Sequence, residues 1–507
     1  MSSERHDVVV VGGGSAGAVV AARLSELATR SVLLLEAGRD ALAQPPDAVL
    51  DGSTLPGAQA EWVRRYPAEL GRGVHGSLVR GALLGGGSAV NGGSFIRGVA
   101  QDFDRWFGAD DALWSARSVL PSFVRSERDL DLGPSDRHGA QGPMPVRRGV
   151  LGGADAVTAA FYEACVGLGH PPEPDKNAWA TPGVGPVPRN VVGGVRVNTA
   201  MAYLGPASAR PNLEIRTGVP ARRVVFDGTG RVAGVEVSGP DGTELVAADR
   251  VVLCAGAIAT AQLLLLSGIG PADELRRVGV DVVVDAPGVG ARCSEHPAVE
   301  LAFVPADAAD LGGAAIDAAL HGAIESADGW QPYEVLALRR SYGRTTGDDP
   351  DDPTLHLRVS LLQPRSRGVL RLQSADPTAP PLIDLGHLSH PVDRLDMRAL
   401  VRLTAEVLGS PAMAAVTADR LDPLGPSSSD VDVDSFVDAH LRTSMHLSGT
   451  APAGPEGDPL AVVDRQLRVN GVEGLAVVDT SVLAAVPSRG PAATAVMLGE
   501  HAAANVL

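Results

Sequence analysis

The sequence predicts an α/β protein in two parts: a three-layer, doubly wound sheet and an α+β domain built on an antiparallel sheet flanked by helices. Two segments carry the first prediction, residues 7–38 and 251–271, because each reads as a buried strand, a glycine turn and a helix. The second prediction rests on alternating apolar and polar residues over 354–362 and 368–372, and on an amphipathic helix over 393–408. With 507 residues the chain is too long for one simple core.

Residues 7–38 carry the fingerprint of a Rossmann-like dinucleotide-binding unit. A β-branched strand over 8–11 runs into a glycine-rich turn, and a helix over 18–28 leads to a second strand over 31–35 that ends on Glu36. The turn matches the pattern G-x-G-x-x-G at Gly12, Gly14 and Gly17. The acid follows the turn by about 20 residues, as this fingerprint requires. The alternative is a glycine-rich surface turn, and the flanking strands and helix argue against it.

Each residue type in the turn has a mechanical reason. Gly14 lets the backbone approach a pyrophosphate, Gly17 lets the helix lie close to the strand, and the helix N-terminus offers free N–H groups. Glu36 can accept hydrogen bonds from ribose hydroxyls and would repel the extra phosphate of NADP. The first predicted cofactor-binding residues are therefore Gly12, Gly14, Ser15, Ala16, Gly17, Glu36 and Ala37. This stretch alone leaves FAD and NAD open.

Charge and composition narrow the class of protein. The formal net charge of −17 argues against a nucleic-acid or anionic-membrane surface. The three cysteines form no CxxC pair, so we expect neither a disulfide framework nor a metal site. The N-terminus runs into the first strand without a signal peptide, and no uninterrupted apolar stretch reaches about 18 residues. We expect a cytoplasmic enzyme without a transmembrane segment, and the sequence leaves peripheral membrane contact open.

A polar, proline-containing segment reads as a loop up to about residue 76, and a second glycine-dense element follows it. Residues 80–98 match the motif R-G-x-x-L-G-G-x-S-x-x-N-G-x-x-x-x-R-G at every fixed position. Residues 251–271 contain a second motif, G-A-I-x-S-P-x-L-L-x-x-S-G-I-G-P, with Thr260-Ala261 in place of Ser-Pro. Together with the fingerprint, these motifs make the chain resemble the glucose–methanol–choline (GMC) oxidoreductase family, nearly from end to end.

The resemblance implies FAD as the cofactor. In the family a loop wraps the flavin and its pyrophosphate, and here that loop contains Leu84, Gly86, Ser88, Asn91 and Gly92. Some members attach the flavin covalently through a histidine, and Val90 occupies that place, so we expect noncovalent FAD. The resemblance also implies that Ala221 lies against the adenine. The further cofactor-binding residues that it implies are Ala255, Gly256, Asp479, Thr480, Pro491, Ala492 and Ala493.

The resemblance also divides the chain into domains. The implied FAD-binding domain is discontinuous and takes residues 1–150, 195–300 and 445–507, whereas the substrate-binding domain takes 151–194 and 301–444. Because the match to family motifs weakens over most of the second domain, the sequence does not identify the substrate.

The resemblance places a catalytic base near the C-terminus. Residues 444–450 resemble the family's H-P-V-G-T motif, which makes His446 the expected active-site histidine. Oxidising an alcohol removes the hydroxyl proton and sends the carbinol hydride to flavin N5, and a base with a pKa near the working pH serves the proton step. Its protonated form and a helix N-terminus then stabilise the negative charge of reduced flavin. We expect His296 and His440 to be ordinary surface or core histidines.

A second active-site residue is missing. The family usually places a His or Asn just before the last helix, and counting back from residues 497–500 puts that position at Ala492. Neither Ala492 nor Pro491 can hydrogen-bond through its side chain. Arg489, Ser444 or a side chain of the substrate domain would have to take this role.

The predicted reaction is oxidation of a CH–OH group by a dehydrogenase, with alternatives. The segments His-Leu-Ser-Gly-Thr and Pro-Ser-Arg-Gly-Pro resemble the mycofactocin-associated GMC dehydrogenases. This resemblance implies that the substrate is a small alcohol or a reduced redox carrier, and the carrier would be reduced mycofactocin. It also implies that the electrons pass to the respiratory chain. The alternatives are a choline- or alcohol-type oxidase that uses oxygen, an FAD-containing hydroxynitrile lyase, and a non-catalytic flavin-binding protein, which the missing side chain at Ala492 favours.

Overall fold

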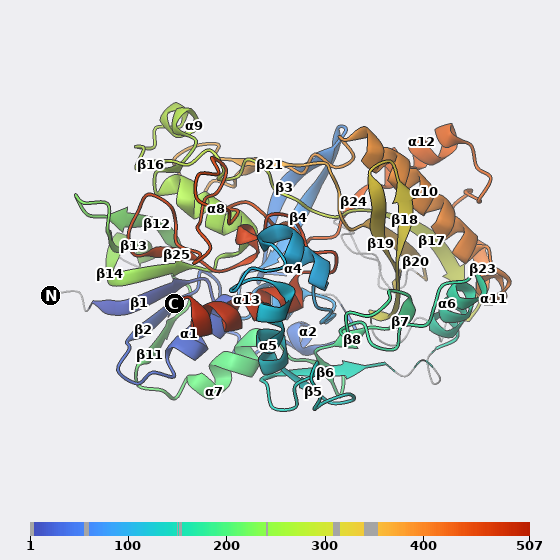
Figure 1. The fold of residues 1–507 in the computed structure, drawn as a ribbon, viewed down its shortest axis with the longest axis horizontal. Coiled ribbons are helices and arrows are strands. Elements are labelled where there is room, and N and C mark those ends of the chain that lie inside the picture. The colour runs from blue at the N-terminus through green and yellow to red at the C-terminus, as the bar shows by residue number, and fades with distance from the viewer. Residues whose placement is uncertain are drawn as a thin grey trace.

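A computed structural model describes residues 5–54, 60–149, 151, 155–239, 242–307, 315–338 and 353–507. Two large sheets occupy opposite ends of an elongated molecule (Figure 1). Between them in this view lie three helices, α4 (Ala100–Phe107), α5 (Ala116–Ser126) and α13 (Ala492–Asn505).

The first sheet contains the dinucleotide fingerprint. Its strand order is β11-β2-β1-β14-β13-β12, with β25 beside β14. In that order the strands span Leu213–Arg216, Val32–Leu35, His6–Val11, Gly242–Leu253, Val232–Gly239, Ala221–Phe226 and, for β25, Leu475–Val477. The strands β11, β2, β1, β14 and β25 pair in parallel, and β12 and β13 extend β14 as an antiparallel meander. Three distant chain segments therefore build one sheet.

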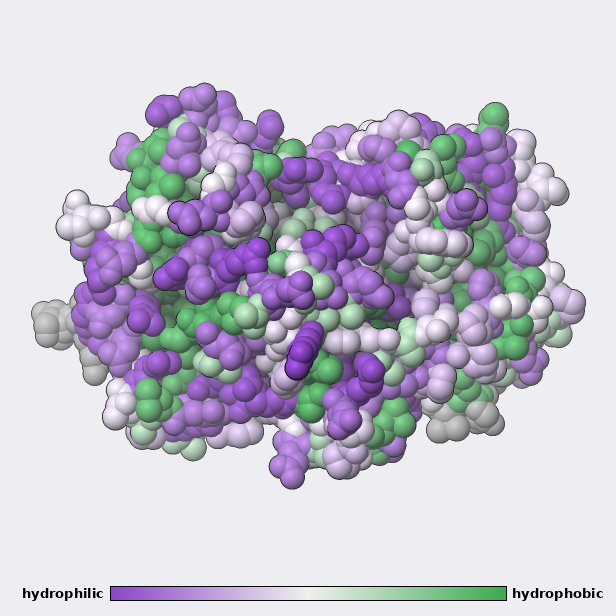
Figure 2. Space-filling model, in the orientation of Figure 1, coloured by the Kyte–Doolittle hydropathy of each residue, from purple (hydrophilic) through white to green (hydrophobic). Residues whose placement is uncertain are grey.

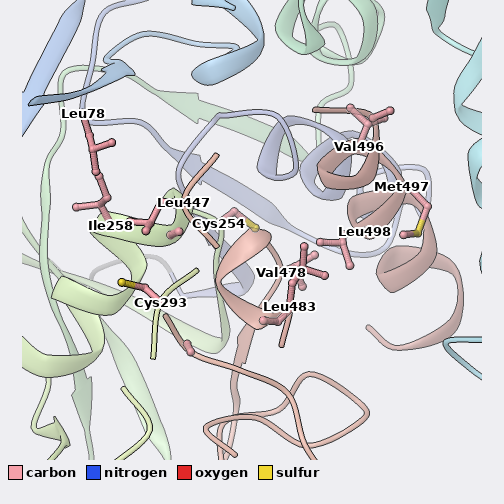
Figure 3. Packing of buried hydrophobic residues seen from close by; sticks show 14 of the residues in the cluster. Leu78, Cys254, Ile258, Cys293, Leu447, Val478, Leu483, Val496, Met497 and Leu498 are labelled. Atoms are coloured by element: carbon pink, nitrogen blue, oxygen red, sulfur yellow. The ribbon is translucent and has the colours of Figure 1, made fainter. Parts of the chain in front are cut away.

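Helices cover both faces of the first sheet. The helix α1 (Gly17–Leu24) contacts α13, which contacts α5, while α8 (Gly256–Leu266) contacts β12. In Figure 1, α8 lies near β12 at the top of the sheet, and α1 and α13 lie beside β1 and β2. Figure 3 shows residues 496–498 of α13 close to the core around Val478 and Cys254. The β1 residues 8–11 are at most 5% exposed, as expected for a strand buried on both faces. The predicted three-layer, doubly wound sheet is confirmed.

The second sheet is antiparallel, as predicted. Its order is β23-β17-β20-β19-β18-β7, with β24 beside β17. In that order the strands span Thr417–Arg420, Pro297–Pro305, Leu355–Leu361, Gly329–Leu338, Ile316–Ser326, Val184–Pro186 and, for β24, Arg442–Thr443. The amphipathic helix appears as α10 and contacts β20. The helices at this end are α6 (Ala156–Gly167), α10 (Pro391–Leu408), α11 (Pro411–Ala415) and α12 (Asp430–His440).

The predicted loop up to residue 76 is wrong. A long hairpin of β3 (Val63–Gly71) and β4 (Val74–Gly81) occupies this segment. Tyr66, Ala68 and Leu70 are buried at alternating positions, but Pro67 and the arginines at 64 and 65 obscure this alternation in the sequence. The hairpin joins β22 (Leu382–Asp384) and β21 (Val369–Arg371) in a four-stranded sheet. The predicted strand at 368–372 therefore belongs here and not to the second sheet, because alternation does not identify a strand's partner.

The remaining elements are short. The helical ones are α2 (Asp47–Leu50), α3 (Gly87–Val90), a π-helical turn (Ala200–Leu204), α7 (Gly205–Ala207), α9 (Ala272–Arg277) and a 3-10 turn (Thr480–Val482). The strands are β5 (Glu127–Asp129), β6 (Met144–Arg148), β8 (Pro188–Arg189), β9 (Val191–Val192), β10 (Val195–Arg196), β15 (Ile269–Gly270) and β16 (Val284–Asp285). Across the described ranges, no helix combines the length and the apolar character needed to cross a bilayer.

Candidate active site

A cavity of about 580 Å³ is lined by residues from both large sheets. Val11 and Glu36, at the carboxyl ends of β1 and β2, line one part of it, and Leu336 of β19 and Arg358 of β20 line another. Doubly wound sheets bind ligands outside the carboxyl ends of their strands, and this volume falls in the range of about 300–1,000 Å³ typical of ligand sites. The cavity is therefore the candidate active site.

Glu36 shapes the end of the cavity nearest β2. Its Oε2 accepts the backbone N–H of Gly13 at 2.8 Å, and its Oε1 accepts that of Gly38 at 2.7 Å. Burial raises the pKa of this carboxyl, and the two N–H donors oppose that rise. The carboxylate is thus held in place by the glycine-rich turn, with Ala37 and Ala221 lining the cavity beside it. This arrangement suits a ribose hydroxyl pair next to an adenine ring.

Two glycine-rich turns meet at the middle of the cavity. A Cβ added at Gly86 would lie 2.7 Å from the Cα of Gly14, and Gly86 has a φ of +49° that favours glycine. Gly12, with a φ of +102°, leaves no space for a Cβ beside the carbonyl of Cys254. The two backbones can therefore approach each other, and both line the cavity. Exposed backbone at the start of a helix is a cradle for phosphate groups.

The predicted cofactor-binding residues fall into two sets. Those that line the cavity are Gly12, Gly14, Ser15, Ala16, Glu36, Ala37, Gly86, Asn91, Gly92, Ala221, Ala255, Gly256, Asp479, Thr480, Pro491 and Ala492.

The other set, Gly17, Leu84, Ser88 and Ala493, lies behind the lining. A Cβ on Gly17 would overlap the carbonyl oxygen of Gly12, and the Leu84 side chain fills the space beside Gly13. Ser88 Oγ donates to the Gly85 carbonyl at 2.6 Å, and Ala493 is fully buried. These residues support the turns and the last helix.

Asp479 fixes the start of α8 against the cavity. Its Oδ2 accepts the N–H of Gly256 at 2.9 Å and the hydroxyl of Thr260 at 2.6 Å. Burial raises the pKa of Asp479, and the hydrogen bonds from Ser481, Thr260 and Gly256 oppose that rise. Thr260 thus supplies a hydroxyl at the motif position where serine is usual.

His446 is held by a pairing between distant segments. β24 pairs with the beginning of β17, which brings residues 444–446 beside the segment that precedes β17. The carboxylate of Glu295 accepts the backbone N–H groups of both His296 and His446 at 2.9 Å. Met445 adopts a φ of +65°, which is rare for a residue with a side chain and typical of functional sites. This turn directs His446 to the cavity that it lines.

Two hydrogen bonds determine the tautomer of His446. His296 Nε2 lies 3.1 Å from the carbonyl oxygen of Leu362, which can only accept, so this nitrogen carries the proton. His296 Nδ1 is then an acceptor, and it lies 3.0 Å from His446 Nδ1. The proton of His446 therefore sits on Nδ1, and Nε2 keeps a free lone pair. A neutral imidazole with a free nitrogen beside a cavity can act as a base.

The surroundings keep His446 neutral. Its burial, and secondly the neighbouring His296, lower the pKa of His446 to about 3. Glu295 is buried as well, but His387 and Thr443 hold the pKa of its carboxyl down at about 2, so it carries a negative charge. That charge favours the protonated imidazole and partly offsets the effect of burial.

The residue that faces His446 is Gly490 and not Ala492. A Cβ added at Gly490 would lie 3.4 Å from His446 Nε2. Ala492 begins α13 and lines the cavity two residues further along. The structure therefore brings Gly490, two residues before the predicted position, against the imidazole, and a glycine offers no side chain there. No side chain caps α13, so its first backbone N–H groups have no side-chain acceptor. Because Pro491 and Ala492 line the cavity, this positive end of the helix lies at the cavity.

Sequence reasoning missed several polar residues of the site. His296 was expected to be ordinary, but it orients His446, and only the spacing of 150 residues hid this contact. Arg358 and Glu334 line the cavity and were not predicted. Of the two residues named above as possible substitutes, Ser444 lines the cavity, whereas Arg489 is buried and does not line it. The segment that carries Arg358 and Glu334 matched no motif, so no sequence signal pointed to them.

A second cluster has the geometry of a metal site but not the chemistry. Glu127, Asp129 and His138 present ligand atoms within 4.8 Å of one another. Arg148 binds both oxygens of Asp129, and Arg97 pairs with Glu127. Burial alone would lower the pKa of His138, but its carboxylate neighbours raise it to about 10, so both ring nitrogens carry protons. This group therefore fits a buried ion network and not a cation site.

The fold and the cavity together define a dinucleotide-binding protein, and its family follows from comparison. Two sequence patterns described as GMC oxidoreductase match residues 6–298 and 364–499. The chain belongs to the GMC oxidoreductase family, whose members are FAD-dependent, and the glycine cradle and Glu36 described above fit that cofactor.

Individual relatives share the whole length of the chain. A GMC-type oxidoreductase from Rhodococcus erythropolis is 39% identical, and the match covers 99% of this chain and 98% of the relative. An oxygen-dependent choline dehydrogenase from Stenotrophomonas maltophilia is 35% identical, covering 98% and 94%. The crystal structure of pyridoxine 4-oxidase from Mesorbium loti has a TM-score of 0.90 at 29% identity and covers 99% of both chains.

Proposed function

We propose that this protein is an FAD-dependent dehydrogenase that oxidises a CH–OH group, with His446 as the base. The observation that carries the proposal is the neutral imidazole of His446, whose Nε2 lone pair is left free at the cavity by the hydrogen bond to His296. The similarity to a choline dehydrogenase and a pyridoxine oxidase supports an alcohol as substrate.

The FAD-binding residues that we propose are those predicted from the sequence. Glu36 would bind the ribose, the backbones of Gly14 and Gly86 would lie against the pyrophosphate, and the loop around Asn91 would contact the flavin. Bound FAD supplies a hydride acceptor at N5. Val90 lines the cavity at the position where some family members carry a linking histidine, which supports noncovalent binding. The proposed domain boundaries are also those predicted above.

The protein's part in the reaction is to move one proton and to stabilise charge. His446 Nε2 takes the hydroxyl proton while its Nδ1–H continues to donate to His296. The buried carboxylate of Glu295 attracts the imidazolium that forms. The uncapped N-terminus of α13 favours negative charge at the same end of the cavity. The alcohol loses a proton and a hydride and leaves as a carbonyl compound.

The motifs around His446 and Gly490 support a narrower proposal. Reduced mycofactocin would be the alcohol and the respiratory chain the electron acceptor, with the enzyme in the cytoplasm. An oxygen-using oxidase is the second candidate, because the choline dehydrogenase relative is described as oxygen-dependent.

Anaerobic rapid mixing of the holoenzyme with alcohols and with reduced mycofactocin tests the proposal. We expect loss of oxidised-flavin absorbance and reoxidation by a quinone. Rapid peroxide formation in air would support the oxidase instead. Product formation with the flavin still oxidised would support a hydroxynitrile lyase. If none of the donors reduced the flavin, the result would support a flavin-binding protein without this activity.

A further inference from the structure

The loop opposite His446 is anchored by one buried serine. Ser488 lies two residues before Gly490 and is 1% exposed. Its Oγ donates to Asp102 Oδ1 at 2.6 Å, and its backbone N–H donates to Asp102 Oδ2 at 2.8 Å. Asp102 belongs to the first turn of α4 and is fully buried. The loop that carries Gly490 is therefore bound to α4 through both polar groups of Ser488.

Gln363 joins this loop to the support of the base. Its Nε2 lies 2.7 Å from Ser488 Oγ. The Ser488 hydroxyl gives its only proton to Asp102, so Oγ accepts from Gln363 and the amide nitrogen must face it. Gln363 directly follows Leu362, whose carbonyl accepts His296 Nε2–H at 3.1 Å. Two adjacent residues after β20 thus hold both sides of the site.

These contacts form a ring around the place where a substrate hydroxyl would meet the base. Its members are hydrogen-bonded to each other or lie close together in the chain, and in order they are His446, His296, Leu362, Gln363, Ser488 and Gly490. The ring closes across a gap, because a Cβ added at Gly490 would lie 3.4 Å from His446 Nε2. The width of this gap therefore depends on the hydrogen bonds of the ring.

Gln363 acts through these neighbours and not by contact with a ligand. Among the described residues, those that line the cavity include His446 and Gly490 but not Gln363. The first turn of α13 has its own attachment, since the Gly98 N–H donates to Thr494 Oγ1 at 3.2 Å. Loss of the Gln363 amide therefore changes the gap and leaves the helix attached. A misplacement of about 1 Å between reacting groups can lower a rate about 100-fold.

We propose that Gln363 is a positioning residue for the oxidation. It fixes the loop at Gly490 relative to the base at His446, so that the substrate hydroxyl meets Nε2 in a reactive geometry. Gln363 itself carries no charge and moves no proton. This inference rests on the proposed oxidation of a CH–OH group with His446 as the base.

The variant Gln363→Met removes the amide donor and keeps an unbranched side chain of similar length. Anaerobic rapid mixing of the holoenzyme with 1-propanol and with benzyl alcohol, each over a range of concentrations, separates the limiting rate constant of flavin reduction from the dissociation constant of the alcohol. We expect the rate constant to fall about 10-fold or more, with the dissociation constant and the FAD content near their wild-type values. An unchanged rate constant in the folded, FAD-loaded variant would refute the proposal. A loss confined to FAD content would indicate a merely structural residue and would also refute it.

Gln373→Met is the matched control. Gln373 is exposed and also donates one hydrogen bond through its Nε2, to the Pro380 carbonyl at 2.8 Å. This variant should keep the wild-type rate constant.

Ser488→Ala removes the acceptor of the Gln363 amide and provides the test if Gln363→Met does not fold. The double variant should reduce flavin no more slowly than Ser488→Ala alone, because residues of one hydrogen-bond network are not additive. Effects that multiply would show that Gln363 does not act through Ser488 and would overturn the proposal.

Hydrogen exchange, read by mass spectrometry, does not depend on activity. In the Gln363→Met holoenzyme we expect the peptide that contains residues 488–490 to exchange about 2- to 10-fold faster than in the wild type, and in Gln373→Met at the wild-type rate. Faster exchange, together with a wild-type flavin that neither alcohol reduces, would support the ring and refute the oxidation. Reduction of the wild-type and Gln363→Met flavins at equal rates would support the oxidation and refute the role of Gln363.

Discussion

A single backbone carbonyl determines which nitrogen of His446 is available for chemistry. Leu362 accepts from His296, and His296 in turn accepts from His446. His446 therefore donates to His296 and His296 donates to Leu362, so both hydrogen bonds are donated in the direction away from the cavity. Such an arrangement orients a base without any charge on the orienting residue.

Replacing His446 tests the proposed base. In His446→Gln we expect the rate constant of flavin reduction to fall by about 100-fold or more, because a positioned base contributes about 10²- to 10⁴-fold. Rapid mixing under anaerobic conditions measures this rate, and flavin absorbance per protein should stay at the wild-type value. His440→Gln, at the end of α12, is the control and should retain the wild-type rate. An unchanged rate in His446→Gln would contradict the mechanism.

The pH dependence of the same rate follows from the buried imidazole. Because burial lowers the pKa of His446 to about 3, the free enzyme already holds the neutral base throughout the neutral range. We expect kcat/KM to show no acid limb from this group between about pH 5 and 8. A limb near pH 6.5 that disappears in His446→Gln would show that the imidazole titrates normally.

At the scale of elements, two turns that are about 70 residues apart in sequence form one cofactor cradle. The turn after β1 and the turn before α3 touch through Gly14 and Gly86. The hairpin β3–β4 leads directly into the second turn and pairs with β22. The hairpin therefore positions the second turn against the first.

The variant Gly86→Ala tests the cradle. A methyl group there would meet Gly14 at 2.7 Å on backbone with positive φ, a strain of about 1–3 kcal/mol. We expect FAD to be retained about 10- to 100-fold less tightly. Flavin absorbance per protein after dialysis measures this loss. Gly167→Ala, where a Cβ meets nothing within 4 Å, should retain FAD normally. Equal retention in the two variants would count against the cradle.

The sequence predicts elements better than it predicts their partners. The fingerprint over 7–38 was readable because glycines and an acid at fixed spacing leave few alternatives. The hairpin β3–β4 was missed because Pro67 and the consecutive Arg64 and Arg65 interrupt the apolar and polar alternation of β3. The contact between His296 and His446 depends on the pairing of β17 with β24, and no local pattern records a pairing between segments 150 residues apart.

At the scale of the whole molecule, buried histidines are expected to lower the stability of the folded protein in acid. Burial lowers the pKa of His446 to about 3 and that of His501 to about 4, against about 6.5 in the unfolded chain. The unfolded chain therefore binds more protons between pH 6.5 and about 4, and the free energy of unfolding falls as the pH falls. Each such histidine costs about 1.4 kcal/mol per pH unit within this window.

Urea unfolding at pH 7 and pH 5 checks this expectation. We expect a lower midpoint at pH 5 and a smaller decrease in His501→Gln, because Gln cannot gain a proton. The raised pKa of His138, about 10, acts in the opposite sense, so stability is also expected to fall from pH 6.5 towards pH 10. A midpoint that rises from pH 7 to pH 5 would contradict the assignment.

The burial of Lys176 has a consequence for the chemistry of the protein's exterior. This residue is 3% exposed, and it is the only lysine in the sequence. Reagents that acylate primary amines should therefore react slowly with Lys176 in the folded protein. Acylation of Lys176 requires that its contacts with Glu173, the Gly183 carbonyl and His321 open, so the extent of labelling, read by mass spectrometry, reports local opening around Lys176.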